Sequence, residues 1–168
     1  MTTTTARMAP MARKSVLTVH VIAGVALVGI TGTVMILAVM AAGAASSAES
    51  HALYRSAQVV ALAMAIPFSV TSLGTGILLG LRTPWGVFRY RWVAAKLLLQ
   101  VGIILMGALA VGPMVEALVE DAGAGRSLGS ERWQLAIAGG VNLAFAVTAV
   151  GLSMFKPGGR LRRAAPGA

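Results

Sequence analysis

Few polar side chains that could bind a ligand interrupt the long apolar runs of this sequence. Apart from serines and threonines, they include His20, Lys96, Gln100 and Asn142. All five acidic residues lie outside the runs. A proton-coupled pump normally needs a carboxylate inside the membrane, and dimetal sites in helical bundles are built from glutamates. The absence of cysteine excludes disulfides, iron–sulfur clusters and cysteine-based zinc sites. The sequence therefore predicts no metal site and argues against a proton-coupled pump.

His20 and Lys96 are expected at similar depth near one end of the fold. His20 lies about one turn inside the first apolar run, and Lys96 lies about one turn inside the third run, which enters from the same side. Gln100 follows Lys96 by four residues and shares its helical face. Small or apolar residues share the face of His20, namely Ala23, Gly24, Leu27 and Thr31. His20, Lys96 and Gln100 form the candidate ligand-binding site.

Three interpretations of this site are open. In the first, no ligand binds: Lys96 extends to the membrane surface, and His20 packs inside and donates to a carbonyl. In the second, His20 is an axial ligand of haem b. Gly24 would then leave room for the macrocycle, and Lys96 or Arg89 would meet a propionate or a second site. In the third, His20 and Lys96 bind the anionic group of a lipid or metabolite. A bis-histidine haem is excluded, because His51 is roughly 30 Å away at about 1.5 Å per residue.

The composition is that of a membrane protein. Of the 168 residues, 57% are apolar and 11% are charged, and the mean hydropathy is +0.82, outside the range of soluble domains. Spans of at least ~20 residues are predicted at 16–43, 51–81, 92–115 and 133–155. They leave a tail at 1–15, a basic tail at 156–168 and no room for a soluble domain. The predicted fold is all-α, a membrane-embedded four-helix bundle.

Basic residues are concentrated before the first run, between the second and third, and after the fourth. They are Arg7, Arg13, Lys14, Arg82, Arg89, Arg91, Lys96, Lys156, Arg160, Arg162 and Arg163. The other two connections carry all the acidic residues, Glu49, Glu116, Glu120, Asp121 and Glu131. The positive-inside rule then predicts a multi-pass protein of the cell membrane, running up-down-up-down with both ends in the cytoplasm. The net charge of +9 indicates anionic lipid headgroups as partners and not nucleic acid, since the basic residues flank the spans instead of forming one face.

The first apolar run also has features of a secretory signal. A basic start at Arg13 and Lys14 precedes it, and the small-residue segment 41–45 ends it. The apolar core of a signal peptide is only ~7–15 residues long, whereas this run covers 16–42. The sequence therefore predicts an uncleaved first helix.

Local signals predict where helices begin, bend and end. Ser46-x-x-Glu49 is a capping box at the start of the second helix, and Ser130 is expected to cap the fourth. Pro67 predicts a kink within the second helix. The acidic, glycine-containing segment 116–132 is predicted as a loop.

Small residues at helical spacing predict close packing between helices. One stripe lies in the second helix and one in the fourth: Ser69, Ser72, Gly76 and Gly80, and Ala136, Gly140, Ala144 and Thr148. Gly76-x-x-x-Gly80 is also a small-xxx-small motif. We expect it to pack inside the bundle, with homodimerisation as the alternative.

Aromatic and basic residues alternate between the second and third spans. Trp85, Phe88 and Trp92 share one helical face at i, i+3 and i+7, and Arg89 lies among them. This pattern is typical of a membrane-interface anchor, with rings at headgroup depth and guanidinium groups on phosphates.

Two resemblances rest on these residues. Residues 72–99, which include Thr83-Pro-Trp-Gly-Val-Phe-Arg-Tyr-Arg-Trp, resemble a family of small actinobacterial integral membrane proteins, as does Leu17-Thr-Val-His-Val. This implies a four-helix membrane fold and no particular activity. More weakly, His20-Val and Trp92-Val-Ala-Ala-Lys-Leu are similar to the copper-resistance D-type and membrane protoporphyrinogen-oxidase bundles, which implies haem binding or copper handling. The chain differs from these bundles in having Ala-Leu-Val-Gly at 26–29, where they carry an aromatic–glycine pattern, and in lacking other intramembrane histidines.

We therefore expect an integral membrane protein that acts as a binding or accessory component, as a homo-oligomer or with a membrane partner. No catalytic residue is predicted. The alternative is a haem-b-binding protein for redox chemistry or tetrapyrrole handling, with His20 as axial ligand. A pore or an exporter of small solutes or lipids is the third class.

Overall fold

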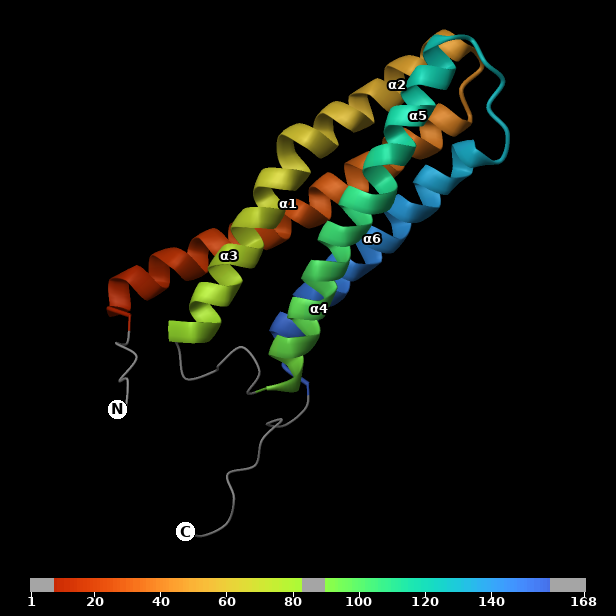
Figure 1. Cartoon of the computed structure of the whole chain (residues 1–168). Coiled ribbons are helices and arrows are strands. Elements are labelled where there is room, and N and C mark those ends of the chain that lie inside the picture. Colours follow the sequence, from red (N-terminus) through yellow and green to blue (C-terminus); the bar gives the residue numbers. More distant parts are fainter. Residues whose placement is uncertain (1–7, 83–89, 158–168) are drawn as a thin grey trace.

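The computed structural model describes residues 8–82 and 90–157, which form a bundle of four long helical runs (Figure 1). The runs are Pro10–Ala42, Ser47–Arg82, Arg91–Gly123 and Glu131–Phe155, and each is long and apolar enough to cross a membrane. Successive runs point in opposite directions, so the first run starts where the fourth ends. We call this end of the bundle the terminal end and the opposite one the distal end. The predicted all-α four-helix fold is confirmed, with no strand in the described residues.

The first and fourth runs are unbroken helices, α1 (Pro10–Ala42) and α6 (Glu131–Phe155). A proline opens α1, at a position where its missing N–H costs no helical hydrogen bond. Because α1 starts at residue 10 and not at residue 16, the last part of the predicted tail 1–15 is helical. Arg13 and Lys14 therefore belong to the helix.

The second and third runs are each interrupted by one π-helical turn just before a proline. The second consists of α2 (Ser47–Val60), η1 (Ala61–Ala65) and α3 (Ile66–Arg82), and the third of α4 (Arg91–Met106), η2 (Gly107–Val111) and α5 (Gly112–Gly123).

Pro67 and Pro113 explain the position of these turns. Proline cannot donate the i→i−4 hydrogen bond and crowds the preceding turn. The residue before it therefore bonds to the carbonyl five residues back and not to the one four residues back. The Ile66 N–H bonds to the Ala61 carbonyl, and the Gly112 N–H bonds to that of Gly107. Figure 1 shows the chain changing direction between α2 and α3, as Pro67 predicted. The equivalent turn before Pro113 was not predicted.

The predicted cap of the second helix is present, with one difference. Ser46 Oγ accepts the Glu49 N–H at 3.2 Å, and the Glu49 carboxylate accepts the N–H of Ala45 at 3.2 Å. In a standard capping box that second bond would go to Ser46 itself. With both bonds formed, the helix begins at Ser47 and not at residue 51.

The predicted cap of the fourth helix is wrong. Ser130 stands at the N-cap position, but its side chain makes no capping hydrogen bond. Its φ of −68° and ψ of −21° are close to helical, whereas a capping serine normally has extended backbone. The Glu131 carboxylate instead accepts the Gly129 N–H at 3.0 Å.

The predicted loop 116–132 is only partly a loop. Helix α5 continues to Gly123, so Glu116, Glu120 and Asp121 are helical. Asp121 forms an ion pair with Arg126 just beyond the helix. The connection to α6 is therefore shorter than the sequence indicated and begins after a charged helix end.

The apolar core lies in the distal half. Its buried side chains come from α1, α2, η2, α5 and α6: Val34, Ala38, Ala41, Tyr54, Ala57, Val111, Val115, Leu118, Ala122, Leu135, Ala136 and Ala138. In the terminal half, several of the buried residues are polar or small, among them Ser69, Ser72 and Gly80 of α3. Helix α4 has one fully buried residue, Ile103. The two halves of the bundle therefore have different interiors.

The two predicted small-residue stripes have different outcomes. Ser69, Ser72 and Gly80 are buried, so the stripe of the second helix faces into the bundle. In the fourth helix, Ala136 is buried and Gly140 lies close to Met35, but Ala144 and Thr148 are exposed, so that stripe is confirmed only in its first half. The inward face of α6 is formed by Leu135, Ala138, Gly139, Asn142 and Ala146.

Candidate functional site

His20, half-buried on α1, is held by α3. Its Nδ1 lies 3.0 Å from the Ser72 carbonyl oxygen and 3.0 Å from Thr75 Oγ1. A carbonyl can only accept, so Nδ1 carries a proton. The Thr75 hydroxyl donates to the Thr71 carbonyl at 2.6 Å, so Thr75 also accepts from the ring. Nε2 then carries a lone pair, or a second N–H when the ring is protonated.

Gly76 lets the imidazole approach α3 closely. A Cβ at this position would lie 3.0 Å from His20 Cε1 and 3.5 Å from Nδ1, closer than carbon atoms normally approach. The predicted packing glycine therefore contacts the predicted ligand-binding histidine. A side chain at Gly76 would displace the ring from its two hydrogen bonds.

Lys96, half-buried on α4, points to α6. Its Nζ donates to Ser153 Oγ at 2.6 Å, and the Ser153 hydroxyl donates in turn to the Ala149 carbonyl at 3.0 Å. Serine is neutral, so it orients the ammonium group without balancing its charge.

Ser72 connects the His20 side of the site with Gln100. Its carbonyl accepts from His20, and its hydroxyl donates to Gln100 Oε1 on α4 at 3.4 Å. His20, Gln100 and Lys96 are thus brought to the same region by three helices, but they do not hydrogen-bond one another directly in the described residues.

The site lies where the bundle divides. In the distal half, α1 and α6 pack closely: a Cβ on Gly139 would lie 3.2 Å from the Met35 Cα. Toward the terminal end the two helices diverge (Figure 1). Here α1 contacts α3 through His20, and α4 contacts α6 through Lys96. We call α1 with α3, and α4 with α6, the two helix pairs. The candidate site lies at the boundary between these pairs.

Two buried amide atoms near this boundary have no hydrogen-bond partner among the described residues. They are Gln100 Nε2 and Asn142 Oδ1. Asn142, on the inward face of α6, is only 7% exposed. Buried polar atoms in folded proteins are nearly always paired, so these two atoms indicate a partner other than the described residues.

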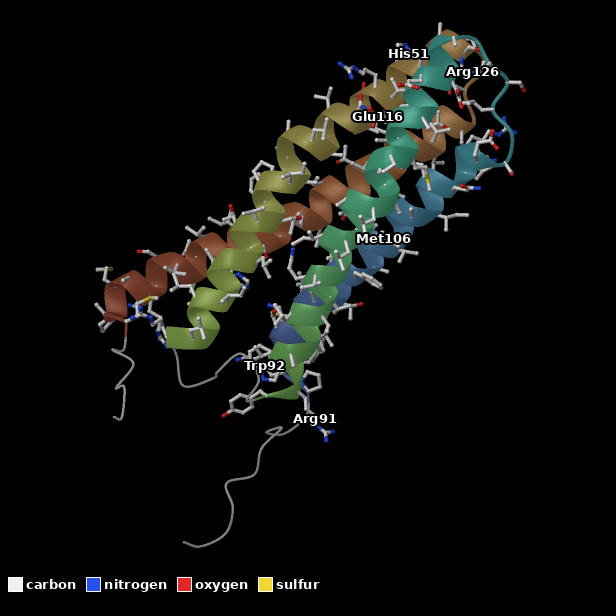
Figure 2. The ribbon with its side chains drawn as sticks, viewed as in Figure 1. His51, Arg91, Trp92, Met106, Glu116 and Arg126 are labelled. Carbon is white, nitrogen blue, oxygen red and sulfur yellow. The ribbon has the colours of Figure 1, made fainter. Side chains whose placement is uncertain are left out.

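The charges around the site have one sign. Every acidic residue of the sequence lies near the distal end, in the first turn of α2, in α5 or at the start of α6. Figure 2 shows Glu116 and Arg126 toward the distal end and Arg91 at the terminal end. Among the described residues, no carboxylate side chain therefore lies in the half of the bundle that holds Lys96.

The other predicted site residues are only partly described. Trp92, the described member of the predicted anchor, is half-buried in the first turn of α4 at the terminal end (Figure 2). Trp85, Phe88 and Arg89 lie outside the described residues. Gly24, proposed to leave room for haem, would have nothing within 4 Å of an added Cβ.

The direct partners of the site were not assigned from sequence. Ser72 was predicted only as a packing residue, and no role was predicted for Thr75 or Ser153. The inward face of α6 is the signal that could have found Ser153, since it follows Asn142 and Ala146 at helical spacing.

The hydrogen bonds of His20 are compatible with one axial bond to haem iron. Donation from Nδ1 to a backbone carbonyl is the usual arrangement of metal-ligating histidines, because it leaves Nε2 for the metal. The described residues contain no group of three or more His, Cys, Asp or Glu side chains that could hold a metal ion by themselves. His20 would supply a single protein ligand.

No protein-family model, curated protein or solved structure matches this chain.

Proposed function

We propose that this chain is a four-span protein of the cell membrane that binds a phosphate or carboxylate group at its terminal end. Both ends of the chain are then cytoplasmic, and the binding site opens toward the inner leaflet. Two observations support this orientation. The four helices are long and apolar enough to cross a membrane, and all acidic residues lie near the distal end. Binding would make the protein an accessory component, alone, as a homo-oligomer or with a membrane partner.

The single observation that carries this proposal is the environment of Lys96. Its ammonium group is half-buried and bonded to a neutral serine, in a half of the bundle where the described residues contain no carboxylate side chain. Burying a charge without a partner costs several kcal/mol. An anion between the helix pairs would supply the missing charge and accept strong, charge-assisted hydrogen bonds from Lys96 and protonated His20.

Binding is tested with two sources of the same anionic group. The full-length protein in detergent is titrated with inorganic phosphate, and in lipid nanodiscs phosphatidylglycerol is compared with phosphatidylcholine alone. Stabilisation by phosphate indicates a water-soluble ligand, and stabilisation by phosphatidylglycerol alone indicates a lipid. Absence of stabilisation in both formats would contradict the proposal.

Gly76→Ala is expected to weaken anion binding about three- to tenfold. The new Cβ would push the His20 ring out of line with Ser72 and Thr75 and so misalign its hydrogen bond to the anion, a loss of about 0.5–1.5 kcal/mol. Gly74→Ala is the matched control on the same helix, because a Cβ there has nothing within 4 Å. Dissociation constants of the two variants are measured by calorimetry, and equal values would show that His20 does not act in binding.

Haem binding is a second candidate, favoured by the donation of Nδ1 to the Ser72 carbonyl. His20 Nε2 would hold the iron, and haem would supply redox or tetrapyrrole chemistry. The protein is expressed with ample haem precursor, and its oxidised and reduced spectra are recorded. A Soret band that disappears in His20→Ala supports this candidate, and a colourless protein excludes it.

A further inference from the structure

The two unpaired amides are the feature that the proposed function leaves unexplained. Gln100 Nε2 and Asn142 Oδ1 are both buried without a partner among the described residues. Gln100 bonds to Ser72 through its amide oxygen, and the nitrogen of the same amide is the unpaired atom.

These amides continue a polar line that starts at Lys96. Gln100 is one turn further along α4, about 6 Å at 1.5 Å per residue. Phe145 of α6 packs against Gly102 of α4, where a Cβ would lie 3.3 Å from Phe145 Cε2. Asn142 is three residues, about 4.5 Å, further toward the distal end than Phe145. Polar side chains therefore extend from the terminal end to the middle of the bundle.

The line ends at the apolar core of the distal half. The residues beyond it are buried and apolar, among them Val34, Val111 and Leu135. In that half, no buried polar side chain of the described residues is unpaired: Tyr54 and Ser50 both donate to backbone carbonyls. The unpaired buried amides of the described residues therefore lie on the terminal side of this apolar core.

We propose that water occupies the interior between the two helix pairs from the terminal end as far as Asn142. Water can donate to Asn142 and accept from Gln100, and it is the usual partner of polar groups that the protein leaves unpaired. A lipid acyl chain in the same place has no polar atom for either amide. The proposal goes beyond anion binding and does not require it, since the water would be present without a ligand. It also implies that a water-soluble anion reaches Lys96 from the aqueous phase.

The absence of cysteine in the chain permits a direct test. Single cysteines are placed at Asn142, at its neighbour Val141, which is 36% exposed on the outer surface, and at Leu135, which is 0% exposed in the distal core. Silver ion is the probe, because it is small, charged and thiol-reactive. It is applied to either side of sealed membrane vesicles, and the thiols that it leaves free are then labelled after denaturation.

Silver applied from the terminal-end side is expected to abolish labelling of Asn142→Cys and leave Val141→Cys and Leu135→Cys fully labelled. Gln100→Cys should behave like Asn142→Cys and provides the test if the latter does not fold. Full labelling of both interior variants in folded protein would overturn the proposal. Equal protection of Val141→Cys, or protection of Asn142→Cys from the distal side, would overturn it as well.

Discussion

Gly139→Leu is expected to destabilise the bundle by about 3 kcal/mol, the upper part of the usual range for overpacking. A Cβ at this position would already lie 3.2 Å from both Cα and Cβ of Met35 and 3.5 Å from its backbone nitrogen. Main-chain atoms cannot rotate out of the way as a side-chain end can, so the leucine would force α1 and α6 apart.

Gly151→Leu is the matched control for this prediction. Gly151 lies on the same helix, and an added Cβ would have nothing within 4 Å. Both variants gain the helix propensity of leucine over glycine, so their difference reports the contact with Met35. Unfolding free energies are measured by denaturant titration in detergent. A Gly139→Leu variant as stable as Gly151→Leu would show that α1 and α6 are not packed as described.

The sequence was sufficient for the elements of the fold because apolar runs and charges are local properties. The four runs, the capping serine Ser46 and the break near Pro67 were all predicted. The ends were less accurate: helices α1 and α5 extend beyond the apolar runs, through Arg13 and Lys14 at one end and Glu116 at another. Charged residues end an apolar run, but they do not end a helix.

The two stripes differ because of the spacing of their residues. Steps of four residues advance about 40° beyond a full turn at about 100° per residue. The fourth-helix stripe takes three such steps and rotates about 120°, from buried Ala136 to exposed Thr148. In the second helix, one step of three from Ser69 to Ser72 compensates for the later steps of four, so Gly80 is still buried.

The site was predicted less well than the fold, because its contacts join distant parts of the chain. His20 meets Ser72 and Thr75, 52 and 55 residues away, and Lys96 meets Ser153, 57 residues away. Spacing along one helix indicates which residues share its face, but not which helix that face meets. A single sequence therefore identified the polar residues and left their partners open.

Lys96→Met is expected to lower anion affinity about 10- to 100-fold. Hydrogen bonds to charged groups contribute about 1.5–3 kcal/mol, and methionine keeps most of the length of the side chain without its charge. In the absence of anion, the variant should be at least as stable as the wild type, because it removes a half-buried charge that no carboxylate side chain of the described residues balances. Added anion should then raise the midpoint of thermal unfolding in the wild type but not in the variant.

Lys14→Met separates this effect from a simple loss of net charge. Lys14 is exposed in the first turns of α1, so its replacement lowers the net charge equally while leaving the interior unchanged. The proposal requires the Lys14 variant to keep the anion-dependent shift of its unfolding midpoint. If both variants lose that shift equally, the anion binds to the basic surface in general. If both variants keep the shift, Lys96 does not bind the anion. If Lys96→Met is less stable than the wild type when no anion is present, the bond to Ser153 alone is sufficient to stabilise the half-buried ammonium group.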